Sequence, residues 1–317
     1  EHQNGVPGGR RGDGEWMIAE ACEYRENFCH LPAEMAVLLA IEADHFDYYR
    51  SLAQLETAFG RFVGALPAGG RLLYAADCPR ACRVARTVRC ASESFGLDAA
   101  GADWRAEIEH VAAARHRFGV RYRDRLLGSV ELAVPGRHNV VNALAAAAAA
   151  FHAGASWRAI AAGLASFAGL RRRLETIVDG PNLAVIDDYA HLPTEIAAGL
   201  ATVRGMYPGR RIWCVFQPHQ ASRTAHLLDE LALSLQNADK LVVAEIFRAR
   251  EAAAMPGEAS AADLARRAAE LGADVAAGHA SEEIAATLKR ALGRGDVVVT
   301  LGAGDIGKLA HDIAQRF

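Results

Sequence analysis

Lysine is nearly absent from this chain of 317 residues, where it occurs only at Lys240, Lys289 and Lys308. The sequence therefore contains no phosphate-binding loop of the GxxxxGK[ST] type. Long apolar segments are missing too, since the longest run, Ala143–Phe151, is far shorter than the roughly 20 residues that span a bilayer. No signal peptide is recognisable. These absences predict a soluble, cytoplasmic protein.

An excess of one charge is also lacking, because 35 basic residues face 38 acidic ones, for a net charge of −3. Nucleic acid is thus not an expected partner, since its phosphate backbone requires a basic surface. The six cysteines form no CxxC pair and no zinc-ligand spacing. Cys22 and Cys214 lie in or beside apolar runs, where buried reduced thiols are common, and we expect a reducing compartment without disulfides.

The apolar content is sufficient for two ordinary globular domains, with 51% hydrophobic and 23% charged residues over 317 positions. The chain begins at Glu1 rather than at a methionine, and we expect it to be a segment of a longer protein or a processed product. Residues 1–15 are rich in glycine and arginine without periodicity, which predicts a loop.

The first half of the chain mixes apolar runs with amphipathic segments. Apolar runs bounded by polar residues predict buried strands at Trp16–Ala21, Met35–Ile41 and Arg71–Ala75. Helical periodicity or high alanine content predicts helices at 51–66, 79–88, 139–153 and 157–167. Short alternating segments between Trp104 and Val134 predict an antiparallel excursion.

The second half alternates regularly between strand-like and helix-like segments, which predicts βαβ units around a parallel sheet. We therefore predict an α/β protein with two domains that meet near Arg173. Residues 1–173 are expected to form a parallel sheet with helices, and residues 174–317 a Rossmann-like domain. The strands of that second domain are expected to pass through Val185, Val215, Val242 and Val298.

Polar side chains follow two of the strands predicted in the first half. Glu20 lies at the end of the first apolar run, and His45 follows the second. In an open parallel sheet, ligands bind beyond the carboxyl ends of the strands, so both side chains are candidates for one divalent cation. Carboxylates suit Mg²⁺ bound beside phosphates, whereas histidine is an unusual magnesium ligand. Solvated strand ends are the alternative interpretation, because charged residues are mostly exposed.

The segment Pro135–Asn142 combines a turn with the start of a helix. Gly136 permits the turn, and Asn139 is a good helix N-cap. Asn139 and Asn142 lie three residues apart, so they share one helix face. Two carboxamides on that face suit the donor and acceptor edge of a purine. A capped core helix with a polar N-terminus explains the same residues equally well.

Charged and imidazole side chains also gather at strand ends around the predicted domain boundary: Arg172 and Arg173, then Asp187, Asp188 and His191, then His219 and Arg223. A guanidinium and a carboxylate facing a cleft suit a phosphoryl group and its metal-bound water. Each residue alone is also compatible with a surface charge. Their common placement at strand ends favours a site.

Taken together, these segments resemble the Mur ligases, the ATP-dependent amide-forming enzymes of peptidoglycan synthesis. The matching segments occur in family order over nearly the whole chain: Glu20-Ala-Cys-Glu-Tyr24, Ile41-Glu-Ala-Asp-His-Phe-Asp-Tyr48, Pro135-Gly-Arg-His-Asn-Val-Val-Asn-Ala-Leu144, Arg172-Arg-Leu-Glu175, Asp187-Asp-Tyr-Ala-His191, Phe216-Gln-Pro-His219 and Gly302-Ala-Gly-Asp-Ile306. Their order makes the resemblance specific, although no single segment is.

The resemblance implies an N-terminally truncated central ATPase domain followed by a C-terminal Rossmann-like ligase domain. It is greatest to the member that joins L-alanine to UDP-N-acetylmuramate through an acyl phosphate. ATP and Mg²⁺ are the implied cofactors, and the other partners are small-molecule substrates, with no nucleic acid and no membrane. The implied roles fall on ten residues: Glu20 and His45 for magnesium, His138, Asn139 and Asn142 for the nucleotide, Arg173, Asp188 and His191 for catalysis, and His219 and Arg223, with His191, for the amino acid.

The sequence also departs from the family pattern. The UDP-sugar domain and the lysine-bearing phosphate loop are missing, and Ala40 and Leu192 replace an asparagine and a histidine that the family usually has. We therefore expect this chain to be a truncated portion of a ligase that is inactive alone. Two alternatives remain open: a non-catalytic relative that acts as a binding module, and a sister ligase that adds a peptide or another amino acid.

Overall fold

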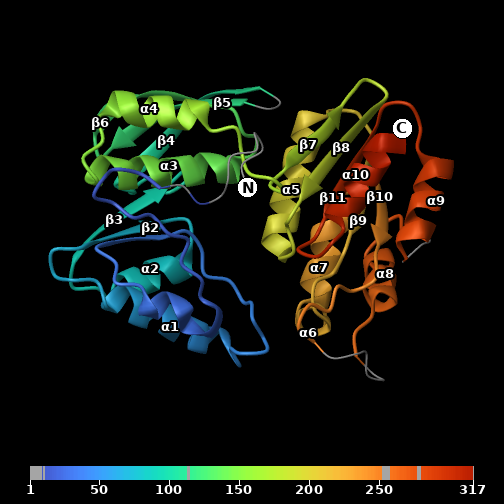
Figure 1. Ribbon diagram of the computed structural model, residues 1–317, viewed down its shortest axis with the longest axis horizontal. Helices are drawn as coiled ribbons and strands as arrows, with labels where there is room; N and C mark the ends of the chain where they lie inside the picture. The colour runs from blue at the N-terminus through green and yellow to red at the C-terminus, as the bar shows by residue number, and fades with distance from the viewer. Residues whose placement is uncertain (1–8, 10, 113–114, 252–257, 277–279, 317) are drawn as a thin grey trace. The chain divides into compact units, whose positions relative to one another are not determined.

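The computed structural model describes residues 9, 11–112, 115–251, 258–276 and 280–316. The chain forms two compact units, Gly9–Phe167 and Ala168–Phe317, and each unit has its own sheet (Figure 1). This division falls slightly before the predicted boundary at Arg173. Arg172 belongs to the second unit because its side chain bonds to Asp187 and to two carbonyls of that unit.

The first unit contains a six-stranded sheet in which the strands lie in chain order. Strands β1 to β4 pair in parallel, and β4, β5 and β6 pair antiparallel, which confirms the predicted antiparallel excursion. Strand β3 was not predicted. The strands are β1 (Met35–Leu38), β2 (Arg71–Ala75), β3 (Ala91–Gly96), β4 (Trp104–Ala112), β5 (Arg115–Tyr122) and β6 (Arg125–Leu132).

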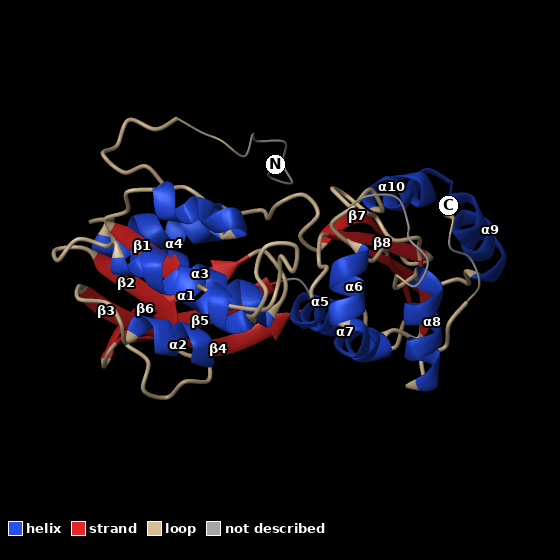
Figure 2. Ribbon diagram, turned by 90° about the horizontal axis from the view of Figure 1, so that it is seen from below, coloured by secondary structure: helices blue, strands red, loops and turns tan. Residues whose placement is uncertain are grey.

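Helices pack on both faces of this sheet (Figure 2). Leu72 of β2 points into the apolar cluster of α1 and α2, whereas the next residue, Leu73, points into the cluster of α3. Ser51 caps α1 by accepting a hydrogen bond from the backbone N–H of Gln54. The helices are the 3-10 helix η1 (Tyr24–His30), α1 (Leu52–Gly64), α2 (Pro79–Ala85), α3 (Arg137–His152) and α4 (Trp157–Ser166).

The strand predicted at Trp16–Ala21 was wrong, because this segment has no regular secondary structure. Met17 is 84% exposed and Ile18 is 94% exposed. Strand β1 is the edge of the sheet and pairs with β2 alone, so the apolar run has no strand partner in the described part of the chain. Cys22, expected in a buried run, is exposed, whereas Cys214 is buried, and all six cysteines lie among the described residues as free thiols.

The second unit contains a five-stranded sheet in the order β10-β9-β11-β8-β7. Its strands are parallel except for β7, which pairs antiparallel with β8 and was not predicted. The predicted parallel sheet is thus confirmed, since each of its four strands contains one of the expected valines. The strands are β7 (Glu175–Asp179), β8 (Leu183–Asp188), β9 (Ile212–Phe216), β10 (Lys240–Val243) and β11 (Asp296–Leu301).

Two layers of helices cover this second sheet. Ile186 faces the cluster of α5, α7 and α8, and its neighbour Val185 faces the cluster of α9 and α10. The chain leaves helical geometry at Leu227, which separates α6 from α7. The helices are α5 (Pro193–Met206), α6 (Ala221–His226), α7 (Leu228–Ser234), the 3-10 helix η2 (Leu235–Asn237), α8 (Ala261–Glu270), α9 (Ser281–Ala291) and α10 (Gly307–Arg316).

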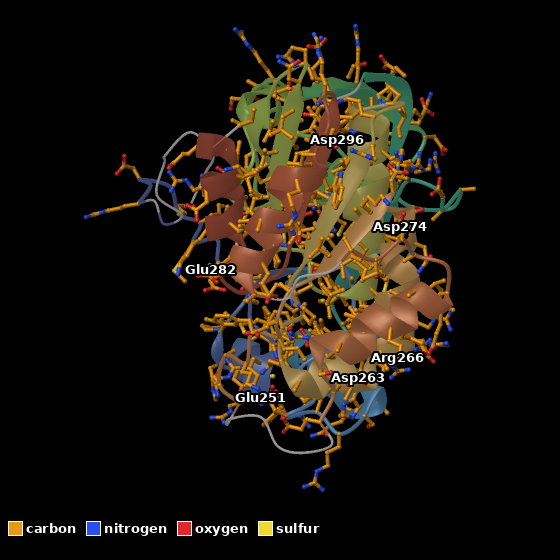
Figure 3. The ribbon with its side chains drawn as sticks, turned by 90° about the vertical axis from the view of Figure 1, so that its right-hand side faces the viewer. Glu251, Asp263, Arg266, Asp274, Glu282 and Asp296 are labelled. Atoms are coloured by element: carbon orange, nitrogen blue, oxygen red, sulfur yellow. The ribbon has the colours of Figure 1, made fainter. Side chains whose placement is uncertain are left out.

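Helix α8 has charged residues on its exposed side. Figure 3 marks Asp263 and Arg266 on α8, where their side chains form an ion pair of 3.0 Å. Ser260 and Asp263 cap the start of the same helix reciprocally. Within the described residues, every helix is too short or too polar to cross a membrane.

Candidate functional site

A group of three side chains in the first unit could hold a cation. Glu23 precedes η1, and Asp44 and His45 lie in the loop that follows β1. Their ligand atoms all lie within 4.8 Å of one another. His45 Nε2 is 2.9 Å from Glu23 Oε1, and this hydrogen bond lowers the pKa of Glu23. His45 has a φ of 54°, a conformation that side-chain-bearing residues rarely adopt, which is typical of functional sites.

The predicted pairing of Glu20 with His45 is not what the structure brings together. Glu20 is exposed, and Glu23 occupies the position beside His45. The cause is local, because Trp16–Ala21 forms no strand whose end could direct Glu20 toward β1. His45 Nδ1 is buried and has no hydrogen-bond partner among the described residues.

The second predicted group lies at the N-terminus of α3. Gly136 makes the predicted turn with a φ of 95° and is itself the N-cap, so the expectation that Asn139 would cap the helix was wrong. Asn139 instead lies in the first turn, where its Nδ2 donates to the carbonyl of Pro135 at 2.6 Å. Asn142 Nδ2 donates to Asn139 Oδ1 at 3.4 Å, which confirms that both carboxamides share a face. His138 beside them is exposed.

The side chain of Arg172 is held by hydrogen bonds within the second unit. Its Nε donates to Asp187 Oδ2 at 3.1 Å, and its two terminal nitrogens donate to the carbonyls of Gly304 and Gly302. Arg172 therefore ties the end of β8 to the loop after β11. Gly307 must remain a glycine beside this contact, because a Cβ there would lie 2.5 Å from Asp187 Oδ2.

Arg173 is exposed, unlike its neighbour. Arg172 and Leu174 both have positive φ angles, of 56° and 49°, so the backbone turns sharply on either side of Arg173. Its guanidinium carbon lies 5.2 Å from the ring centroid of Tyr189. The arginines line a pocket of about 460 Å³ together with Glu175, Asp187, Tyr189, Gly304, Asp305, Gly307 and His311. Such a pocket suits an anionic group.

The two aspartates at the end of β8 are buried. Thr300 Oγ1 donates to Asp187 Oδ1 at 2.7 Å, and burial raises the pKa of Asp187 despite the nearby Arg172. Asp188 accepts a hydrogen bond from the backbone N–H of Ala190 at 3.3 Å. Burial raises the pKa of Asp188 to about 7, and the charge of Arg173 opposes this rise. A carboxyl group that titrates near neutrality is typical of functional sites.

His191 lies in the turn that leads into α5. Its Nδ1 is 3.1 Å from the carbonyl oxygen of Tyr189 and 3.3 Å from Glu195 Oε2. Glu195 also accepts hydrogen bonds from the backbone N–H groups of His191 and Leu192 at 3.0 and 3.2 Å. One carboxylate thus holds both the backbone and the imidazole of His191.

His219 and Arg223 contact each other. Arg223 is 3% exposed, and its Nη1 lies 2.8 Å from His219 Nδ1 and donates to the His219 carbonyl at 2.9 Å. On its other side, the His219 ring stacks on Phe247 with centroids 5.7 Å apart. Phe247 in turn packs against Gly304, where a Cβ would lie 2.6 Å from its ring. The guanidinium of Arg223 is therefore buried against His219 and does not point into solvent.

These side chains of the second unit form one continuous row. Tyr189 lies 5.6 Å from His191, and His191 lies 6.0 Å from His219, both measured between ring centroids. With Arg173 at one end and Phe247 at the other, the row joins the arginine-lined pocket to a pair of histidines. The predicted residues Arg173, Asp188, His191, His219 and Arg223 thus come together in one region.

Some residues of these groups were missed from the sequence. Glu195 lies four residues after His191 and at the third position of α5, a spacing that signals helix capping. Glu23 and Asp44 lie within the quoted motifs, but nothing in the pattern distinguishes them from Glu20. Phe247 reaches His219 through a bridge between the ends of β9 and β10, and no local signal predicts it.

Comparison with known families gives two matches. The Mur ligase middle domain matches residues 10–150, and the glutamate ligase domain of Mur ligases matches residues 172–304. The UDP-N-acetylmuramate–L-alanine ligase of Clostridium acetobutylicum is 40% identical over 95% of this chain and 65% of its own length. That of Acetivibrio thermocellus is 38% identical over 95% of this chain and 64% of its own. The chain thus spans slightly less than two thirds of these relatives.

Solved structures support the fold. The UDP-N-acetylmuramate-alanine ligase MurC of Thermotoga maritima superposes with a TM-score of 0.73 at 24% identity, over 92% of this chain and 61% of that one. MurF of Acinetobacter baumannii superposes with a TM-score of 0.73 at 20% identity, over 91% of this chain and 61% of that one. MurF of Thermotoga maritima in complex with ADP superposes with a TM-score of 0.69 at 17% identity, over 92% of this chain and 64% of that one.

Proposed function

Because this chain belongs to the Mur ligase family, we propose that it serves the ATP-dependent joining of L-alanine to UDP-N-acetylmuramate in peptidoglycan synthesis. The observation that carries the proposal is the row from Arg173 to Phe247, which links an arginine-lined pocket to two histidines within one unit. The names of its relatives, at up to 40% identity, support this substrate pair. ATP is the family's energy source, and the ADP-bound MurF relative supports a nucleotide partner.

In the proposed reaction, the carboxylate of UDP-N-acetylmuramate attacks the γ-phosphate of ATP and forms an acyl phosphate. Arg173 is the proposed phosphate contact, because it is exposed at a pocket that three arginines line together with three carboxylates, and Arg172 already binds one of these carboxylates. Asp188 is proposed to lie by the nucleotide. His138, Asn139 and Asn142 are proposed to contact the nucleotide from the start of α3, where two carboxamides share one face.

The cation group fits Mg²⁺, since Glu23 and Asp44 offer carboxylate oxygens beside His45. When bound, Mg²⁺ supplies positive charge that offsets the charge developing on transferred phosphoryl oxygens. The residues themselves orient one another, because His45 donates toward Glu23 and the backbone N–H of His45 donates to Asp44. Glu20 lies outside this group, and its role as a ligand stays a prediction.

In the second step, the amine of L-alanine displaces phosphate from the acyl phosphate. His191, His219 and Arg223 are proposed to form the amino-acid site, because the ring centroids of the two imidazoles lie 6.0 Å apart and Arg223 binds one of them. The protein's main contribution is then positioning and charge, as in other phosphoryl transfers.

The test is phosphate release that depends on L-alanine. The protein expressed from its complete open reading frame is incubated with ATP, Mg²⁺, UDP-N-acetylmuramate and L-alanine. Turnover is expected with L-alanine and is expected to be lost in Arg173→Ala. A non-catalytic relative would release no phosphate with any amino acid, and a sister ligase would prefer a peptide or another amino acid.

A further inference from the structure

The contacts of His191 determine which of its nitrogens carries the proton. A backbone carbonyl can only accept a hydrogen bond, and the carbonyl of Tyr189 lies 3.1 Å from Nδ1. Neutral His191 therefore has its proton on Nδ1, and its Nε2 has a lone pair. This is the arrangement of a proton acceptor whose other nitrogen is anchored, as in other histidine bases.

The contacts of His219 place the proton on the opposite ring nitrogen, Nε2. A guanidinium has no lone pair to offer, so Nη1 of Arg223, at 2.8 Å, can only donate to Nδ1. Neutral His219 therefore has its proton on Nε2 and presents an N–H donor. The stack on Phe247, with 18° between the ring planes, restrains the ring, and the second bond from Arg223, to the His219 carbonyl, anchors the guanidinium beside it.

We propose that this protein holds the adjacent imidazoles of His191 and His219 in opposite tautomers, with Arg223 and Glu195 as positioning residues. His191 then accepts a proton from the incoming amine, and His219 donates a hydrogen bond to an oxygen of the substrate. Glu195, whose Oε2 lies 3.3 Å from Nδ1, stabilises the imidazolium that forms at His191. The functional part of this proposal rests on the proposed ligase function.

The step balances without any further reactant. The amine nitrogen forms a bond to the acyl carbon, and the bond from that carbon to the phosphate oxygen breaks. The electron pair of the broken bond leaves with phosphate, and the proton of the amine passes to Nε2 of His191. His219 transfers no proton, because its N–H serves as a donor to the oxygen that gains charge.

The tautomers can be measured directly on the 317-residue chain, independently of any activity. Long-range ¹H–¹⁵N correlation spectra distinguish the protonated from the bare nitrogen in each of its 12 histidines. The spectra are recorded at pH 8.5, about two units above the ordinary histidine pKa of about 6.5. We expect a bare Nε2 at His191 and a bare Nδ1 at His219, with signals assigned through His191→Gln and His219→Gln. The reverse tautomer at either ring would overturn the proposal.

A variant separates the positioning role of Arg223 from a structural one. Arg223→Lys keeps the charge but removes Nη1, the nitrogen that reaches both Nδ1 and the carbonyl of His219, from its fixed position in a planar guanidinium. We expect His219 to become a mixture of tautomers in this variant, while His191 keeps its own. An unchanged single tautomer at His219 would show that Arg223 does not set it. If the variant does not fold, the wild-type spectra still decide the assignment.

Turnover by the protein from its complete open reading frame tests the chemical roles. We expect His191→Gln to lower kcat about 100-fold and Glu195→Gln about tenfold, with the KM for ATP unchanged. Glu230→Gln, on the exposed surface of α7, is the matched control and should retain wild-type kcat. Wild-type kcat in Glu195→Gln would refute its role. Correct tautomers without any ligase turnover would refute the proposed function and leave the tautomer assignment supported.

Discussion

Replacing Asp188 by asparagine is expected to remove a pH dependence from the stability of the second unit. Asp188 is 6% exposed, and burial raises its pKa to about 7 from the ordinary 3.8 that applies when the chain is unfolded. Between these two values the folded state holds a proton that the unfolded state has lost. The free energy of unfolding therefore falls as the pH rises through this window.

The size of the effect follows from the window. Each pH unit within it lowers the free energy of unfolding by about 1.4 kcal/mol. Between pH 5 and pH 8, the free energy of unfolding falls only up to the folded pKa of about 7, which is an interval of about two pH units. The wild type should therefore lose about 3 kcal/mol of stability from pH 5 to pH 8, and Asp188→Asn should not lose it. At pH 5 the neutral carboxylic acid and the carboxamide are near-isosteric, and the two proteins should be similarly stable.

Urea unfolding at both pH values measures this difference. Labelling with 5-fluorotryptophan lets ¹⁹F NMR follow Trp213 of β9, which reports on the second unit alone. Asp312→Asn, at an exposed position of α10, is the matched control and should behave as the wild type. An equal loss of stability from pH 5 to pH 8 in wild type and Asp188→Asn would refute the reasoning.

Three further substitutions test other contacts. Arg172→Ala removes the partner of buried Asp187 and should lower the free energy of unfolding of the second unit by about 3–5 kcal/mol, measured in the same urea experiment. Glu93→Gln should lower that of the first unit by about 2 kcal/mol, because Glu93 accepts hydrogen bonds from four side chains that a carboxamide cannot all satisfy. Glu23→Gln should weaken Mn²⁺ binding about tenfold in paramagnetic resonance titrations, whereas Glu20→Gln should not; the reverse order would assign the cation to Glu20.

The second unit could be predicted almost completely from the sequence, for a physical reason. Parallel strands buried on both faces give continuous apolar runs, such as Ile212–Phe216, and the ends of such a run indicate the ends of the strand. Strand β7 escaped prediction because it is an antiparallel edge strand with partly exposed residues. Its formation depends on β8 rather than on its own pattern.

The first unit shows what an apolar run alone does not determine. Trp16–Ala21 and Met35–Leu38 have similar composition, yet only the second becomes a strand, because β2 supplies its hydrogen-bond partners. The direction of Glu20 was inferred from that strand, so the predicted placement of Glu20 beside His45 has lost its structural basis, while its role as a ligand stays a prediction. By contrast, the pairing of Asn139 with Asn142 depends only on helix geometry, and it was predicted correctly.

The adjacent arginines Arg172 and Arg173 show how one motif can divide between stability and chemistry. Arg172 directs its donors to Asp187 and to two carbonyls of the loop after β11, so few remain for a ligand. Its positive φ, and that of Leu174, turn the backbone so that Arg173 is exposed at the pocket. Lysine cannot replace the planar fork of Arg172, whereas a single charge suffices to attract an anion. A lysine at position 172 should therefore lower the stability of the second unit, and a lysine at position 173 should leave it unchanged.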